Sequence, residues 1–91
     1  MPKQVILKIE GMVQGVLFRA ETKKIADRLG ITGYIKNEAD GSVIVVAQGN
    51  ETALRKLTIW CRKGPSRAQV KNIDLKIRPA KSLYEEFQIK Y

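Results

Sequence analysis

The sequence predicts an α+β fold in which an antiparallel sheet carries two helices on one face. Three segments, near residues 5–9, 73–77 and 87–91, alternate apolar and polar side chains, which is typical of strands with one buried face. Two longer segments repeat apolar residues at the three- and four-residue spacing of amphipathic helices. An Asp-Gly pair between two further apolar segments is typical of a hairpin.

The first strand and the first helix follow from two local patterns. Val5, Leu7 and Ile9 alternate with their neighbours and are expected to face the core. Helical spacing predicts a helix over residues 19–29, and Gly30 is a natural C-terminal stop for it. The apolar face of this helix is expected to contain Phe18, Thr22, Ile25, Ala26 and Leu29.

The middle of the chain predicts a hairpin and a second helix. Strands are expected over residues 32–36 and 43–48, on either side of the Asp-Gly link. Asn50 is suited to cap the next helix, because its side-chain oxygen accepts from the first free N–H groups. A Gly-Pro pair at residues 64–65 ends that helix. Its buried face is expected to contain Ala53, Leu54, Leu57, Trp60 and Cys61.

Two more strands are expected in the C-terminal third. Ile73, Leu75 and Ile77 alternate with charged residues and should face inward. The apolar phase slips by one residue ahead of Ile73, which indicates a bulge near residues 71–72. After a turn over residues 80–86, a short fifth strand ends the chain.

The order of these elements predicts a ferredoxin-like two-layer sandwich, βαββαβ with a short fifth strand. A chain of 91 residues is expected to form a single domain, residues 1–91. Its N-terminal apolar run is too short for a signal peptide or a membrane span, so the expected location is cytoplasmic.

Composition excludes several kinds of catalytic site. The chain has no histidine and a single cysteine, Cys61. Nucleophile–histidine pairs and zinc sites built on histidine or several cysteines are therefore excluded. The net charge is +8, and its excess lies in residues 52–81, which carry nine basic residues and one acid.

The turn between the first strand and the first helix has the features of an anion-binding loop. Gly11 and Gly15 permit backbone angles closed to other residues, so successive N–H groups can converge. The start of the helix adds free N–H groups and the positive end of its dipole. Arg19 adds a planar fork of donors that matches two phosphate oxygens. The pattern indicates a phosphate-sized ligand, and a plain strand-to-helix turn is the alternative.

Two groups of residues carry a family resemblance. The first group is Gly11, Val13, Gln14, Gly15, Val16, Phe18 and Arg19. The second group is Gly33, Tyr34, Lys36, Asn37, Gly41, Ser42, Val43 and Gly49. Together they resemble the two signatures of the acylphosphatase family. Ile35 and Ile44 depart from the usual pattern at strand positions, where they bear on packing and surface detail rather than on chemistry.

This resemblance implies an acylphosphatase, a hydrolase that needs no metal or cofactor. The reaction would cleave the carboxyl–phosphate bond of small acyl phosphates, giving a carboxylate and inorganic phosphate. The implied phosphate-binding groups are Arg19 and the backbone N–H groups of Gly15, Val16, Leu17 and Phe18. Asn37 is implied to orient the attacking water, so Arg19 and Asn37 are the expected catalytic residues. The leaving carboxylate has a conjugate-acid pKa of about 4, so no general acid is required.

Two other function classes are alternatives to this one. Cys61 and Arg67 have the spacing of cysteine-dependent phosphatases, but Cys61 falls on the expected buried face of a helix. The basic segment makes a nucleic-acid-binding module the main alternative, although the first and third strands offer no aromatic ring for base stacking.

The expected partners are a small acyl phosphate and inorganic phosphate. No specific nucleic acid and no membrane are expected. The sequence leaves the oligomeric state open, with a monomer as the expectation, and does not identify the physiological acyl phosphate.

Overall fold

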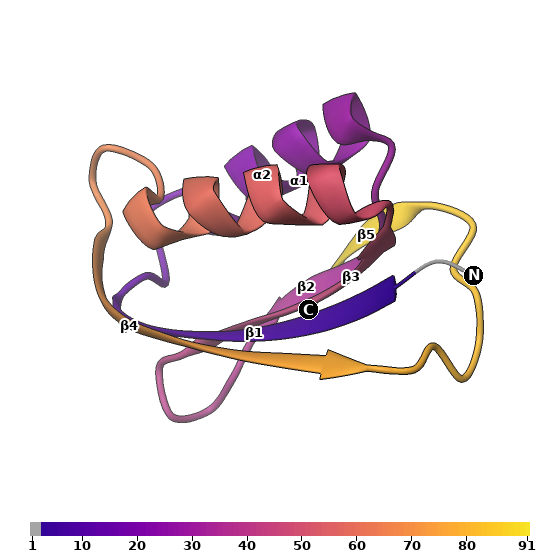
Figure 1. Cartoon of the computed structure of the whole chain (residues 1–91). Helices are drawn as coiled ribbons and strands as arrows, with labels where there is room; N and C mark the ends of the chain where they lie inside the picture. Colours follow the sequence, from indigo (N-terminus) through magenta and orange to yellow (C-terminus); the bar gives the residue numbers. More distant parts are fainter. Residues whose placement is uncertain (1–2) are drawn as a thin grey trace.

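The computed structural model describes residues 3–91 and shows two layers, a sheet and a pair of helices on one of its faces (Figure 1). The expected element order and the ferredoxin-like arrangement are confirmed. Within the described residues, neither helix has the length and apolar character needed to cross a membrane. The elements are β1 (Lys3–Met12), α1 (Phe18–Leu29), β2 (Thr32–Asn37), β3 (Val43–Gly49), α2 (Glu51–Lys63), β4 (Gln69–Arg78) and β5 (Phe87–Lys90).

The strands lie in the order β4-β1-β3-β2-β5. The first four strands of the chain pair in antiparallel fashion, as predicted. β5 instead pairs with β2 in parallel, so the complete sheet is mixed. The path of the chain explains this difference. Residues 79–86 leave the end of β4 and cross that end of the sheet to its opposite edge (Figure 1). β2 starts at the same end of the sheet, so β5 runs in the same direction as β2.

A β-bulge marks the point where β1 approaches the turn to α1. The register between β1 and β4 shifts after Glu10, and Lys71 is the extra residue on β4, which confirms the predicted bulge. Gly11 has a φ of 130° at this point, and a side chain there would collide with the carbonyl group of Gln69. The close approach of the two strands therefore requires glycine.

The core lies between the sheet and the helices, but β4 contributes less to it than its sequence pattern predicts. Leu7 and Ile9 of β1 are fully buried, as expected. Leu75 and Ile77 of β4 face the helix layer, as predicted, but they remain 42% and 64% exposed. Both side chains point to the helix side, but β4 is an edge strand and nothing in the described chain lies beyond it.

Candidate active site

The turn between β1 and α1 borders a cavity of about 230 Å³. Arg19 and Asn37, which were singled out from separate motifs, both line this cavity. Of the expected phosphate-binding groups, only Val16 is absent from its wall, and its side chain lines a neighbouring hollow beside Trp60. The residues that line the cavity are Val13, Gly15, Leu17, Phe18, Arg19, Ala20, Asn37, Ile89 and Tyr91.

The backbone of this turn takes the left-handed conformation on both sides of Val16. Gly15 has a φ of 73°, and Leu17 has a φ of 65° and a ψ of 17°. Leu17 is the only non-glycine residue with a positive φ within residues 3–91. This conformation is strained by about 1 kcal/mol or more for such a side chain, and strain of this kind gathers at functional sites.

The backbone N–H groups of the turn are available as donors. From Gly15 through Arg19, none of them pairs with an acceptor in the part of the chain that the structure describes. Left-handed residues between others turn successive N–H groups toward one side, and the first turn of a helix adds its own free donors. The turn therefore offers a group of donors suited to an anion.

Phe18 fixes the start of α1. Its ring is buried and meets Trp60 edge-on, with the ring centroids 5.6 Å apart. α2 ends at Gly64, where a side chain would come within 2.7 Å of the Phe18 ring. The Thr22 hydroxyl donates to the Phe18 carbonyl oxygen at 2.7 Å. The first turn of α1 is thereby held against α2, which fixes the position of the adjacent Arg19.

Arg19 is half-buried and forms no ion pair within residues 3–91. Its guanidinium carbon lies 4.7 Å from the centroid of the Tyr91 ring, a cation–π contact. Tyr91 itself is almost fully exposed. The charge of Arg19 is therefore free to meet an anion in the cavity.

Asn37 ends β2 and pairs with Val43 of β3. Its Oδ1 atom is buried and has no hydrogen-bond partner within the described residues. Nearly all buried polar atoms in folded proteins are paired, and an unpaired one costs about 1–3 kcal/mol. Asn37 therefore lines the cavity and carries a buried acceptor that no donor of the described residues uses.

Gln14 joins the turn that carries Arg19 to the β2–β3 loop that follows Asn37. Its Nε2 atom donates to the carbonyl oxygens of Glu38 at 2.8 Å and Ser42 at 2.9 Å. The Glu38 N–H group also donates to the Ser42 carbonyl oxygen, at 2.8 Å. These bonds hold the β2–β3 loop against the turn that follows β1, and they fix Asn37 relative to Gly15. In the sequence Gln14 is only a motif match, and its bonds show how the two signatures meet.

Comparison with known proteins decides the family. The family model for acylphosphatase matches residues 5–89 of this chain. The chain belongs to the acylphosphatase family. It is 43% identical over 89 residues to an acylphosphatase of Thermotoga maritima, covering 98% of both chains. It is 44% identical over 90 residues to an acylphosphatase of Lactobacillus johnsonii, covering 98% of this chain and 99% of the relative.

Solved structures agree with this assignment. The crystal structure of acylphosphatase from Bacillus subtilis matches with a TM-score of 0.94 and 30% sequence identity, covering 98% of this chain and 99% of that one. The predicted resemblance to acylphosphatases is therefore confirmed. The protein is accordingly a hydrolase, as the resemblance implied.

Ile89 and Tyr91 also line this cavity, but the sequence does not identify them as site residues. The alternation of Phe87, Ile89 and Tyr91 predicts a strand, but it does not say which strand is its neighbour. β5 lies beside β2, and the Lys23 Nζ atom of α1 donates to the Phe87 carbonyl oxygen at 2.9 Å. This pairing brings the C-terminal residues to the cavity.

Cys61 is buried in α2 and does not line the cavity that Arg19 and Asn37 share. Burial raises the pKa of its thiol to about 12, so the thiol stays protonated at neutral pH. Arg67, which completes the spacing of a cysteine-dependent phosphatase, lines the neighbouring hollow with Pro65 and Ser66. These positions argue against cysteine-based catalysis.

Proposed function

We propose that this protein hydrolyses the carboxyl–phosphate bond of small acyl phosphates without a metal ion or cofactor. One observation carries the proposal: the turn with free backbone donors, Arg19 without an ion pair and Asn37 with its unused acceptor all line one cavity. The donors suit the phosphoryl oxygens, and the acceptor suits a water molecule. Membership in the acylphosphatase family supports the same activity.

The donors bind and neutralise the phosphoryl group. The N–H groups of Gly15, Val16, Leu17 and Phe18 would donate to its non-bridging oxygens. Arg19 would bind two of these oxygens through its planar fork. Phosphoryl transfer depends mainly on positioning and on stabilising charge, and preorganised N–H groups and a guanidinium supply both.

Asn37 orients the attacking water. Its Oδ1 atom would accept a hydrogen bond from water and hold the water oxygen in line with the phosphorus. An amide cannot take up the proton, so the proton passes to a phosphoryl oxygen of the substrate. The new bond joins the water oxygen to phosphorus, and the bond from phosphorus to the carboxyl oxygen breaks. The carboxylate leaves without a general acid, because its conjugate-acid pKa is about 4.

Hydrolysis of benzoyl phosphate by the purified protein tests the proposal. We expect turnover well above the buffer rate, with the same rate in the presence and absence of EDTA. A rate no higher than buffer, or a complete loss of activity with EDTA, would overturn it. We also propose that the protein acts as a cytoplasmic monomer on small molecules, which sedimentation and cell fractionation would check.

A further inference from the structure

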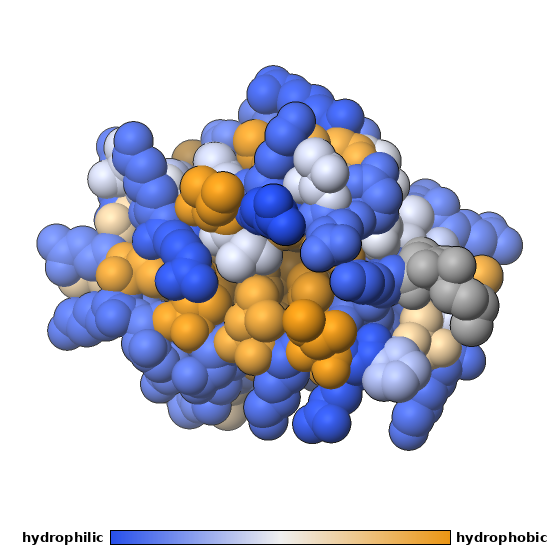
Figure 2. Space-filling model, in the orientation of Figure 1, coloured by the Kyte–Doolittle hydropathy of each residue, from blue (hydrophilic) through white to orange (hydrophobic). Residues whose placement is uncertain are grey.

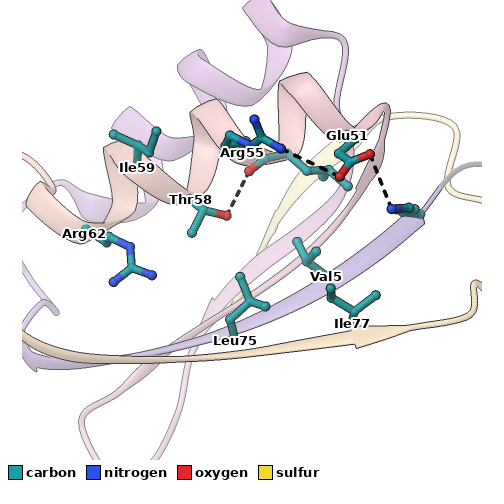
Figure 3. A pocket seen from close by; sticks show the side chains of 10 residues that line it. Val5, Glu51, Arg55, Thr58, Ile59, Arg62, Leu75 and Ile77 are labelled. Carbon is teal, nitrogen blue, oxygen red and sulfur yellow. Dashed lines mark hydrogen bonds and ion pairs between the residues drawn. The ribbon is translucent and has the colours of Figure 1, made fainter.

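A second groove lies between α2 and the outer edge of the sheet, and it shares no lining residue with the candidate active site. Its volume is about 270 Å³. Leu75 and Ile77 of β4 point into it from below, and α2 forms its upper side (Figure 3). The two helix residues Ile59 and Arg62 border it above, and Val5 of β1 lies at its back.

The groove exposes apolar surface to solvent. Ile59 is 61% exposed, and the two β4 residues Leu75 and Ile77 are similarly uncovered. Figure 2 shows apolar surface gathered between α2 and β4 with hydrophilic surface around it. A contiguous apolar surface with a polar rim is typical of an interaction site.

The free edge of β4 defines what shape of partner fits. β4 lies at one edge of the sheet and pairs only with β1 in the described part of the chain. The outward N–H and C=O groups of an edge strand are available to an added strand. A strand added there would place every second side chain beside Leu75 and Ile77, in the groove under α2.

The charges around β4 define the chemistry of that partner. Residues of β4 that alternate with Leu75 and Ile77 point to the opposite face of the sheet. These residues are Asp74, Lys76 and Arg78. Along the groove, Glu51 pairs with Lys3 at 3.5 Å and with Arg55 at 3.8 Å, whereas Arg62 forms no ion pair within residues 3–91. The edge therefore favours an acidic strand and repels a second copy of this basic chain.

We propose that the groove between α2 and β4 binds an extended segment of an acidic partner protein. The segment adds a strand outside β4 and alternates apolar with acidic residues. Its apolar side chains cover Leu75 and Ile77 under α2, and its carboxylates face Lys76 and Arg78 on the other side of the sheet. This interaction uses the basic segment 52–81, which the proposed hydrolysis leaves without a role.

The probe is a fluorescein-labelled peptide of eight residues that alternates Glu and Val. Its binding is measured by fluorescence anisotropy at about 0.15 M salt. The control peptide has the same composition with all Glu residues before all Val residues. We expect the alternating peptide to bind about tenfold more tightly, because only it can divide its side chains between the two faces. Equal affinity of the two peptides would overturn the proposal.

Matched variants locate the site. Ile77→Ser and Lys76→Glu should each weaken binding about fivefold to tenfold, on the scale of one apolar or charged contact. Their controls are Leu83→Ser, at an exposed leucine outside the groove, and Lys24→Glu on α1. The controls should bind like the wild type. All four variants should keep the wild-type circular dichroism and benzoyl phosphate turnover, so this test is independent of the proposed reaction.

Amide hydrogen exchange tests strand addition directly. Bound peptide should protect alternate amides of β4 that exchange freely in the protein alone. Protection elsewhere, or none in β4, would overturn the proposal. Two further outcomes would also overturn the proposal. One is a dimer that forms through this face without peptide, as measured by sedimentation. The other is complete displacement of the peptide by octanoate, which would indicate that the groove binds a small apolar ligand instead of a strand.

Discussion

At the scale of single residues, Arg19 and Asn37 line the same cavity with different chemical groups. Arg19 offers a permanent charge that no carboxylate in the described chain neutralises. Asn37 offers a buried oxygen with no donor. A charge suits the phosphate throughout the reaction, whereas a neutral acceptor suits the water that attacks it. Substitution of the two residues should therefore impair the reaction in different ways.

Arg19→Ala should weaken the binding of substrate and of inorganic phosphate together with turnover. The guanidinium would contact phosphate in both the ground state and the transition state, so KM and kcat should both change. Arg19→Lys should restore little, because an ammonium group keeps the charge but not the planar fork. Steady-state kinetics with benzoyl phosphate and inhibition by inorganic phosphate measure both effects. Unchanged phosphate inhibition in Arg19→Ala would contradict the assignment.

Asn37→Ala should lower turnover about 100-fold, on the scale of losing a positioning group. Inhibition by inorganic phosphate should stay near the wild-type value, because the side chain would contact the water and not the phosphate. The variant should also be at least as stable as the wild type to thermal unfolding, since the oxygen removed has no partner. Near-normal turnover would show that Asn37 does not orient the water.

At the scale of elements, the β2–β3 hairpin holds Asn37 in place, and Gly33 allows its two strands to pack closely. Gly33 has a φ of 136°, and a side chain there would collide with the Val46 carbonyl group. Gly33→Ala should therefore destabilise the protein by about 2 kcal/mol or more. Gly41→Ala is the matched control, because Gly41 also has a positive φ but has open space around it. Urea unfolding measures both, and equal losses would contradict the steric explanation.

Asp40 makes the loop of this hairpin sensitive to pH. Its Oδ1 atom accepts from the Ser42 hydroxyl at 2.6 Å and from the Ser42 N–H group at 3.0 Å. These bonds, with a further contribution from Lys8 at 3.1 Å, hold the pKa of Asp40 well below its ordinary value of 3.8. A carboxyl whose pKa is lower in the folded state stabilises the fold above its unfolded pKa. That stabilisation is lost as the pH falls toward the folded pKa.

Asp40→Asn should consequently be less stable than the wild type at pH 7, and the difference should shrink as the pH falls below about 4. The effect should be small, because Asp40 is on the surface. Denaturant midpoints for both proteins across this pH range measure it. A difference that stays constant with pH would mean that the ionised carboxylate is not responsible.

At the scale of the whole molecule, the uneven distribution of charge along the chain predicts how strongly the protein binds nucleic acids. The excess of basic residues lies in segment 52–81, which contains α2 and β4. Single-stranded RNA should bind weakly and lose affinity steeply between about 50 mM and about 200 mM salt, because surface Lys and Arg release counterions. Filter binding or anisotropy measures this. Tight, sequence-selective binding at about 0.15 M salt would favour the nucleic-acid alternative.

Much of the fold and part of the candidate site follow from local chemistry, and so they could be predicted. Gly30 ends α1 with a φ of 69°, and Asn50 caps α2 by accepting from the Ala53 N–H group at 2.7 Å. Arg19 and Asn37 were found because each sits within a short signature. Such features depend on a few neighbouring residues, whose conformational preferences are present in the sequence itself.

The sequence by itself determined the order of the elements, the bulge at Lys71 and the family. Only the tertiary structure decided that β5 lies parallel to β2, that Tyr91 reaches Arg19, and that Leu75 remains uncovered. A period of two in the sequence tells which side chains share a face of a strand. Whether that face is covered, and by what, depends on the strand's neighbours, and these are set by the path of the whole chain.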